Sequence, residues 1–368
     1  MNASHASRLD QTRRAMDSAG ADALVVTHLP NVFYLCGFTG SNAALIVLSG
    51  AHHLFTDGRY TIQAAEESPG TRIHIVRTAV SEACGGFLAQ KGLAQQSRRT
   101  RLRVGFDPAH LSLAEWTRLR KAAGARIRWK PAAGLVETLR EVKDAAELAI
   151  MREAAKLGSE VMEEVIGLVR PGVTEIDLVA EIDYRMRRKG ADGVSFESIV
   201  ASGPRAALPH ARPTAKRLQK REFVVLDLGA ILRHYCSDLT RTVYLGKAPA
   251  NARKWYRAVE QAQQAALEAL QAGVTAGSVD RAARRTLERS GLGRYFVHST
   301  GHGLGIEVHE TPRLGRGQRQ EIRVGNVVTL EPGIYLQGVG GIRIEDDVAV
   351  LSGGVEVITS APRGLLEI

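Results

Sequence analysis

The sequence has few cysteines, few aromatic residues and no long hydrophobic run. Its three cysteines, Cys36, Cys84 and Cys236, are widely spaced and form no CxxC pair. This pattern argues against a disulfide framework or a cysteine zinc site and fits a reducing compartment. No stretch approaches the roughly 18 apolar residues of a membrane span, and the first residues lack the apolar core of a signal peptide. We therefore expect a cytoplasmic protein with no membrane partner.

The chain is basic, with 49 lysines and arginines against 39 acidic residues and a formal net charge of +10. Basic runs at 98–103 and 216–221 would suit a phosphate backbone. Aromatic residues make up only 5% of the chain and are not interleaved with these runs, so no base-stacking platform is indicated. We interpret the runs as solvated loops and do not expect nucleic acid as a partner.

The length of 368 residues, of which 44% are hydrophobic, predicts two domains with sizeable cores. Residues 1–130 alternate helical patterns with short apolar runs such as 23–26 and 44–48, which is typical of an α/β domain. Pro131-Ala132-Ala133-Gly134 indicates a junction, so we place a linker at 131–143 and a second domain at 144–368.

The second domain carries a weak internal repeat. Gly172 and Gly190 recur 101 residues later as Gly273 and Gly291. A helical stretch lies between the glycines of each pair, and β-rich sequence follows each stretch. Two such halves predict an α+β domain with pseudo-two-fold symmetry and a cleft between the halves. The alternative is a chance recurrence of common helix-start residues.

Four acidic residues stand at the ends of apolar runs: Asp227, Asp238, Glu331 and Glu345. A carboxylate buried in a sheet without a cation costs several kcal/mol. The spacing of Asp227 and Asp238 permits a hairpin that places both acids on facing strands. Arg343 and Glu345 are two residues apart, so on a strand they share a face. Each acid alone fits a turn or an edge, whereas the four together favour a divalent-cation site.

Histidines supply the other candidate ligands. His298, His302 and His309 lie close together in sequence, and His210 lies further upstream. The spacing of His298 and His302 resembles a helical zinc pair, but glycines flank His302 and no glutamate follows His298, which excludes HExxH. We expect a loop or strand that delivers histidines to a pocket. P-loop, dinucleotide and GxSxG motifs are absent.

Six segments resemble the motifs of the M24 metallopeptidases, a family that includes aminopeptidase P, prolidase and methionine aminopeptidase and has the "pita-bread" α+β fold. They are VLDLG at 225–229, CSDLTRT at 236–242, STGHGLG at 299–305, VHE at 308–310, LEPG at 330–333 and GIRIED at 341–346. YLCGFTGS at 34–41 and FTDGRY at 55–60 resemble the creatinase-type N-terminal domain of the Xaa-Pro branch. Methionine aminopeptidases lack that domain, and creatinase lacks the ligand set.

The resemblance implies two bound divalent ions, with a hydroxide between them that attacks the scissile carbonyl. Mn²⁺ is expected because the ligand set is rich in oxygen and has one imidazole, with Co²⁺ or Zn²⁺ as alternatives. Asp238 and Glu345 would bridge the ions. The implied ligands are Asp227, Asp238, His302, Glu331 and Glu345.

The resemblance also implies roles for the surrounding residues. Glu331 would transfer a proton to the leaving proline nitrogen. His210 and His309 would stabilise the oxyanion or orient the substrate. His298 would line the proline pocket, and Arg343 would order the ligands or contact the substrate.

The expected activity is that of an Xaa-Pro aminopeptidase, which removes the N-terminal residue from peptides with proline in second position. The alternative is a strict Xaa-Pro dipeptidase, or prolidase. Another alternative is a catalytically silent binding protein on the same fold. It is less favoured because silent members of the family usually lose ligand positions, and this sequence retains all of them. A homodimer is a further expectation from the family resemblance.

Overall fold

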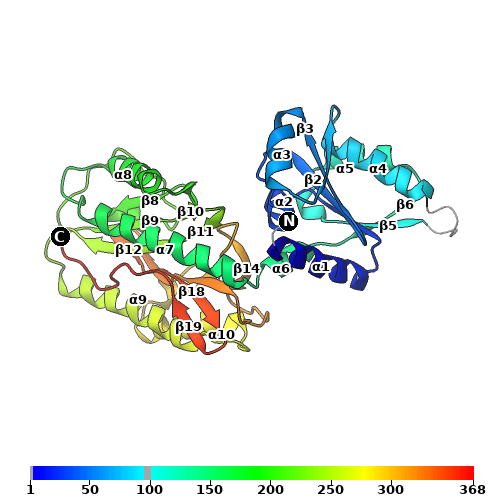
Figure 1. Cartoon of the computed structure of the whole chain (residues 1–368). Helices are drawn as coiled ribbons and strands as arrows, with labels where there is room; N and C mark the ends of the chain where they lie inside the picture. The colour runs from blue at the N-terminus through cyan, green and yellow to red at the C-terminus, as the bar shows by residue number, and fades with distance from the viewer. Residues whose placement is uncertain (1–2, 95–100) are drawn as a thin grey trace. The chain divides into compact units, whose positions relative to one another are not determined.

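The structure is a computed structural model that describes residues 3–94 and 101–368, and it divides into two compact units, Met1–Arg140 and Glu141–Ile368 (Figure 1). The division falls inside the segment 131–143 that the sequence predicts as a linker. Helix α6 (Leu135–Arg140) occupies part of that segment and belongs to the first unit. The junction is therefore partly helical rather than an extended connection.

The first unit is a six-stranded mixed sheet covered by helices on both faces (Figure 1). Its spatial order is β4-β3-β2-β1-β5-β6, in which the outer pairs are parallel and β1, β2 and β3 are antiparallel. The predicted runs at 23–26 and 44–48 are indeed strands. The strands are β1 (Ala23–Val26), β2 (Ala43–Leu48), β3 (His52–Asp57), β4 (Arg72–Val76), β5 (Leu102–Phe106) and β6 (Ile127–Pro131).

Alternate residues of each strand face opposite helical layers. Val25 and Ile46 pack in one core with Leu88 and Leu119 of helices α4 (Val80–Ala94) and α5 (Leu113–Ala123). The other face meets α1 (Ala3–Ser18) and α2 (Leu29–Cys36), and α6 packs against these two helices. A short helix, α3 (Thr61–Glu67), and two 3₁₀ turns, η1 (Gly58–Tyr60) and η3 (Pro108–His110), complete the described part of this unit.

The second unit has two halves, each with a helix pair against a sheet. In the first half α7 (Ala145–Ile166) and α8 (Glu175–Arg188) share a core with the sheet β8-β9-β12. In the second half α9 (Ala250–Ala269) and α10 (Ala276–Arg289) share a core with the sheet β14-β13-β15-β18-β19. The strands of the two sheets are β8 (Ile199–Ser202), β9 (Phe223–Leu228), β12 (Leu239–Tyr244), β13 (Gly301–Gly303), β14 (Glu310–Leu314), β15 (Val327–Leu330), β18 (Asp346–Leu351) and β19 (Gly354–Val357).

The repeat predicted from the glycines is confirmed by this arrangement. Helices α8 and α10 begin and end 101 residues apart, and their N-cap residues are Thr174 and Thr275. Each helix pair accompanies an antiparallel strand pair, β9 with β12 and β15 with β18. The second unit therefore has the pseudo-two-fold α+β architecture that the sequence predicts.

The predicted hairpin between Asp227 and Asp238 is wrong in its connection, although β9 and β12 do pair. The intervening residues form β10 (Ala230–Leu232) and β11 (Tyr235–Cys236), which pair with each other, and β10 also pairs with β7 (Gly193–Val194). The tight turn lies at Arg233 and His234, both with positive φ, as two-residue hairpin loops require. A local turn thus inserts a second small sheet between the two acids.

Among the described residues, no helix is long and apolar enough to cross a membrane. The predicted basic run at 98–103 lies partly outside the described residues. In the run at 216–221, Lys216 Nζ pairs with Glu222 at 2.8 Å and Arg217 donates to the carbonyl of Gly172 at 2.7 Å. This run is therefore not the wholly solvated loop that the sequence analysis expects.

The three cysteines are buried, and their reactivity provides a simple test of the two cores. Burial raises the pKa of Cys36 to about 11 and that of Cys236 to about 12, and it also raises the pKa of Cys84. At pH 8 a thiol with a pKa near 11 is ionised to only about one part in 10³. We expect iodoacetamide to modify none of the three in the folded protein and all three in urea, as counted by mass spectrometry. Rapid labelling of the folded chain would contradict this packing.

Candidate metal centre

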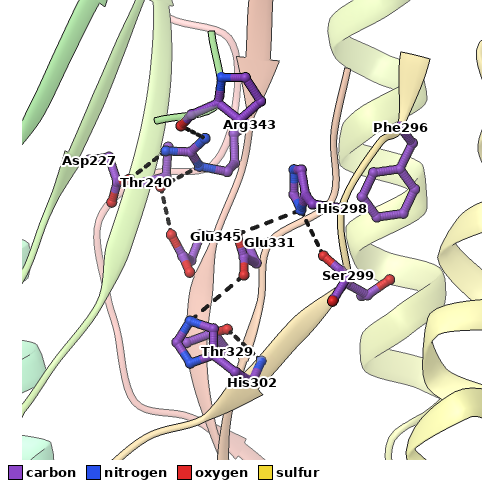
Figure 2. Close-up of polar contacts among 12 residues, drawn as sticks. Asp227, Thr240, Phe296, His298, Ser299, His302, Thr329, Glu331, Arg343 and Glu345 are labelled. Atoms are coloured by element: carbon purple, nitrogen blue, oxygen red, sulfur yellow. Dashed lines mark hydrogen bonds and ion pairs between the residues drawn. The ribbon is translucent and has the colours of Figure 1, made fainter. Parts of the chain in front are cut away.

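Four carboxylates from both halves of the second unit converge in one region, and Figure 2 shows three of them, Asp227, Glu331 and Glu345. Asp227 belongs to β9, and Asp238 immediately precedes β12. Glu331 lies between β15 and β16 (Gly333–Leu336), and Glu345 lies between β17 (Gly340–Arg343) and β18. Thr240 pairs directly with Asp227 and stands two residues after Asp238. The side chains of Asp227, Asp238 and Thr240 therefore share one face of the β9–β12 pair.

The strand that carries His302 is crowded by its neighbours. A Cβ at Gly301 would lie 1.9 Å from the carbonyl oxygen of Thr329, and one at Gly303 would lie 2.2 Å from that of Thr311. Only glycine fits at both places, which explains the sequence around His302. The sequence analysis expects a loop or strand rather than a helix at this point, and the structure has a strand, β13.

His302 faces the carboxylates. Its Nε2 lies 3.7 Å from Asp238 Oδ2 and 3.7 Å from Glu331 Oε1. Its Nδ1 lies 3.0 Å from the carbonyl oxygen of Gly303. A proton on Nδ1 satisfies that carbonyl and leaves the Nε2 lone pair directed at the acids. Burial lowers the pKa of His302 to about 4, so the ring is neutral at pH 7.

The electrostatics of the acids favour a bound cation. Burial, followed by the charge of neighbouring carboxylates, raises the pKa values of Asp238 and Glu345 well above their usual range. Burial raises the pKa of Glu331 to about 7. Asp227 Oδ1 is buried and has no hydrogen-bond partner. Without a cation Asp238, Glu331 and Glu345 would hold protons or carry buried negative charge, which is costly in such a site.

The donor set fits divalent metal ions. Asp238, His302 and Glu345 each offer a ligand atom, and these atoms lie within 4.8 Å of one another. The unpartnered oxygen of Asp227 and the carboxylate of Glu331 adjoin this group. Several carboxylates with one imidazole suit Mn²⁺, Co²⁺ or Zn²⁺.

Arg343 connects two of the candidate ligands, Asp227 and Glu345. Its guanidinium pairs with Asp227 Oδ2 and donates from Nη1 to Tyr335 Oη at 2.9 Å. Its Nε donates to Thr240 Oγ1 at 3.1 Å, and that hydroxyl donates to Glu345 Oε2 at 2.6 Å (Figure 2). The buried Arg343 side chain thus joins Asp227 of the first half and Glu345 of the second half in one hydrogen-bond network.

The remaining predicted histidines surround the same region. His298 Nε2 lies 2.8 Å from Tyr335 Oη, and its Nδ1 lies 4.0 Å from Glu331 Oε2. The ring of His309 meets the ring of His302 edge to face at 4.4 Å between centroids. His210 is exposed and follows Pro209, whose carbonyl accepts from Arg343 Nη1 at 3.0 Å. The structure thus brings all nine predicted residues together.

Sequence reasoning missed the residues that support this site. Tyr335 contacts both His298 and Arg343, and Thr240 connects Arg343 to Glu345. Asp347 is fully buried and accepts the backbone N–H of Asp238 at 2.9 Å. The pair of acids Asp346-Asp347, directly before the apolar run 348–351, could have identified Asp347 as a supporting residue. Tyr335 and Thr240 carried none, because an isolated tyrosine or threonine in a strand is ordinary.

Replacing Tyr335 with phenylalanine tests this supporting network. The Tyr335 side chain is buried, and burial raises the pKa of its hydroxyl to about 12, so the hydroxyl stays protonated. Its loss removes one contact from His298 and one from Arg343. For the peptide hydrolysis that the family resemblance implies, we expect kcat/KM to fall by about 10- to 100-fold with unchanged metal content. Residues that hydrogen-bond to the groups around a metal typically have effects of this size. An unaltered kcat/KM would show that the hydroxyl is not needed to position His298 or Arg343 for the reaction.

Comparisons with known proteins agree with this geometry. Residues 149–352 match the model of metallopeptidase family M24, and residues 8–142 match the Creatinase/Prolidase N-terminal domain. The first match spans more than half of the chain. The chain belongs to metallopeptidase family M24, with a creatinase-type domain before a pita-bread catalytic domain.

Individual relatives match over nearly the whole chain. The Xaa-Pro dipeptidase of Pyrococcus horikoshii is 31% identical over 351 residues, which is 95% of this chain and 96% of the relative. The structure of an Xaa-Pro dipeptidase from Bacillus anthracis is 35% identical with a TM-score of 0.91, covering 99% of this chain and 100% of that one. The structure of an X-Pro aminopeptidase from Thermotoga maritima is 32% identical with a TM-score of 0.85, covering 96% and 100%.

Proposed function

We propose that this protein is a metal-dependent Xaa-Pro dipeptidase, which hydrolyses the bond between an N-terminal residue and a C-terminal proline. The observation that carries the proposal is the convergence of Asp227, Asp238, His302, Glu331 and Glu345 in the second unit. The similarity to named dipeptidases favours this alternative over the aminopeptidase that the sequence analysis placed first. The similarity to an X-Pro aminopeptidase keeps that activity as the second candidate.

The five converging residues would hold two divalent ions, and such ions supply an activated water and a polarised carbonyl. The other side chains prepare the site for this chemistry. Arg343 and Thr240 fix the orientation of Asp227 and Glu345 through the contacts described above. Mn²⁺ as the resident metal, the homodimer and the cytoplasmic location stay predictions.

The proton chemistry is assigned to the chain's own groups. Glu331 has a carboxylate whose pKa burial raises to about 7, so it can accept a proton and donate it to the leaving nitrogen near neutral pH. His210 and His309 are exposed, and they would donate hydrogen bonds to a developing oxyanion or orient the substrate. His298, held by Tyr335, would contact the proline ring.

A dipeptidase must also bind the free carboxylate of its substrate. Arg313 is an exposed cation on β14, and its Nε donates to Ser299 Oγ at 2.8 Å. Ser299 follows His298 directly in the chain. We propose that Arg313 pairs with the substrate carboxylate, a geometry that guanidinium groups favour. A longer peptide has no carboxylate at this position and gains nothing from this contact.

The test compares Xaa-Pro, Xaa-Pro-Yaa and Xaa-Ala-Yaa peptides, using metal-stripped protein with and without added Mn²⁺, Co²⁺ or Zn²⁺. We expect metal-dependent cleavage of Xaa-Pro alone, and a rise in KM for Xaa-Pro in Arg313→Gln. Release of the first residue from Xaa-Pro-Yaa would move the assignment to the aminopeptidase. If no peptide is cleaved with any metal, the peptidase proposal fails and the silent binding protein replaces it.

A further inference from the structure

A buried ion pair on α10 contacts the segment that carries His298. Asp280 is 1% exposed and Arg284 is 8% exposed. The two lie one helical turn apart, and the guanidinium donates from Nε to Asp280 Oδ2 at 2.7 Å and from Nη2 to Oδ1 at 3.0 Å. Neither residue lies in the six motif segments of the second unit, so nothing above assigns them a role.

The pair holds the backbone of three alternate residues. Arg284 Nη1 donates to the carbonyl oxygen of Phe296 at 3.1 Å, and Nη2 donates to that of His298. Asp280 Oδ1 accepts the hydroxyl of Thr300 at 2.9 Å and the Thr300 backbone N–H at 3.1 Å. That N–H also donates to a carbonyl of β14 at 2.8 Å. The chain on both sides of His298 is therefore fixed to one helix.

The ring of His298 is reached by the same contacts. The Arg284 guanidinium lies 4.2 Å from the centre of the Phe296 ring, and that ring meets the His298 ring edge to face at 5.1 Å between centroids (Figure 2). On its Nε2 atom His298 has Tyr335 Oη at 2.8 Å. The orientation of the imidazole thus depends on Tyr335 and on backbone and ring contacts that lead to Arg284.

A purely stabilising role explains the pair less well. Burying two opposite charges costs desolvation energy that their attraction barely repays, so such pairs add little net stability. Apart from each other, the side-chain hydrogen-bond partners of Asp280 and Arg284 within the described residues are Phe296, His298 and Thr300. A planar guanidinium with several fixed N–H groups suits the orientation of two carbonyls at once. The contacts of the pair are therefore concentrated on the His298 segment.

We propose that the Asp280–Arg284 pair positions His298 for contact with the proline of the substrate. The pair touches no substrate and acts through the backbone on both sides of His298. Without the guanidinium, the His298 carbonyl loses a donor and the Phe296 ring loses its cation, so the imidazole samples other orientations. This inference rests on the proposed function, in which His298 would contact the proline ring.

The kinetic test is a double-mutant cycle on an Xaa-Pro dipeptide, with Arg284→Met, His298→Ala and both together. Arg284→Met alone should lower kcat/KM by about 10- to 100-fold, the scale for misplacing a group that contacts substrate. In the His298→Ala background the same change should cost less than about threefold, because the residue that it positions is gone. Losses that multiply in the double variant would overturn the proposal.

Arg285→Met is the matched control. Arg285 is the next residue of α10 and its side chain is exposed, so the same chemical change occurs on the same helix away from His298. We expect kcat/KM to stay at the value of the unaltered protein. An equal loss in both variants would contradict the proposal, because it would arise from the helix as a whole.

Metal analysis separates this effect from damage to the candidate ligands. The carbonyl oxygen of Thr300 accepts the backbone N–H of Glu331 at 2.8 Å, so a disturbed segment could reach a ligand. We expect the metal content of dialysed Arg284→Met to match that of the unaltered chain. A loss of metal would overturn the proposal, since the kinetic effect would then originate at the ligands.

Hydrogen exchange of the metal-free protein tests the positioning without any substrate. We expect the backbone amides of 296–301 to exchange at least about tenfold faster in Arg284→Met and at the unaltered rate in Arg285→Met. Unchanged exchange in Arg284→Met would overturn the inference even if Xaa-Pro is cleaved. If the unaltered chain cleaves no peptide but exchange accelerates as expected, the proposed function fails and the positioning of the His298 segment stands.

A second variant covers the case in which Arg284→Met does not fold. Asp280→Leu combined with Arg284→Met replaces both charges by apolar side chains, which preserves stability more often than removing one partner does. Circular dichroism verifies that this variant is folded. The cycle with His298→Ala and the exchange of 296–301 should give the same results in it, and a kcat/KM equal to that of the unaltered protein would overturn the proposal.

Discussion

Replacing Asp238 with asparagine is expected to lower kcat/KM by at least about 10³-fold, equivalent to roughly 4 kcal/mol of transition-state stabilisation. The carboxylate is buried, and it shares one group of ligand atoms with His302 and Glu345. Asparagine has nearly the same shape but no charge, so the cation loses a central partner. Kinetics on an Xaa-Pro dipeptide and metal analysis of the dialysed protein measure the two consequences together.

Asp177→Asn is the matched control for this substitution. Asp177 is an exposed residue that completes the capping box of α8, so the same chemical change occurs outside the site. We expect kcat/KM and metal content to stay at the values of the unaltered protein. If Asp238→Asn retains its metal and most of its activity, Asp238 is not a ligand.

Replacing Arg241 with methionine is expected to lower the free energy of unfolding by about 3–5 kcal/mol, the scale for removing one partner of a buried ion pair. The Arg241 side chain is 2% exposed and pairs with the fully buried Asp346 at 2.8 Å. Its guanidinium also donates to the carbonyl oxygens of Glu345, Ala361 and Pro362. Methionine fills similar space but removes the guanidinium from these carbonyl oxygens, and it leaves Arg363 as the cation beside Asp346.

Arg152→Met is the surface counterpart of that substitution. Arg152 pairs with Glu356 at 2.6 Å, but the side chains are 41% and 37% exposed. Solvent screens such a pair, so we expect a loss of at most about 1 kcal/mol. Urea unfolding of both metal-free variants separates the cases, and equal losses would show that burial does not govern the strength of these pairs.

Much of the fold could be predicted because its signals are local. Asp144 and Thr174 cap helices through boxes formed with residues three positions later, and such boxes are readable in any sequence. The strands of the first unit appear as short apolar runs between turn residues. The 101-residue repeat was visible because both halves begin their second helix with the same residues.

The partners of the charged residues could not be predicted in this way. Arg343 meets Asp227 across 116 positions of sequence, and Thr240 meets Glu345 across 105. The hairpin between Asp227 and Asp238 failed for a related reason, since the positive-φ turn at Arg233 and His234 was not recognised.

By itself the sequence determined the two-domain order, the repeated halves of the second unit and the set of acids and histidines that belong together. These features follow from helix caps, apolar runs and the cost of burying a carboxylate, which each segment carries on its own. Only the tertiary structure decided which acids face one another, which pair with arginine and which oxygens remain unpartnered. Electrostatic energies depend on the distance and burial of each pair, and both are set when segments distant in the chain pack together.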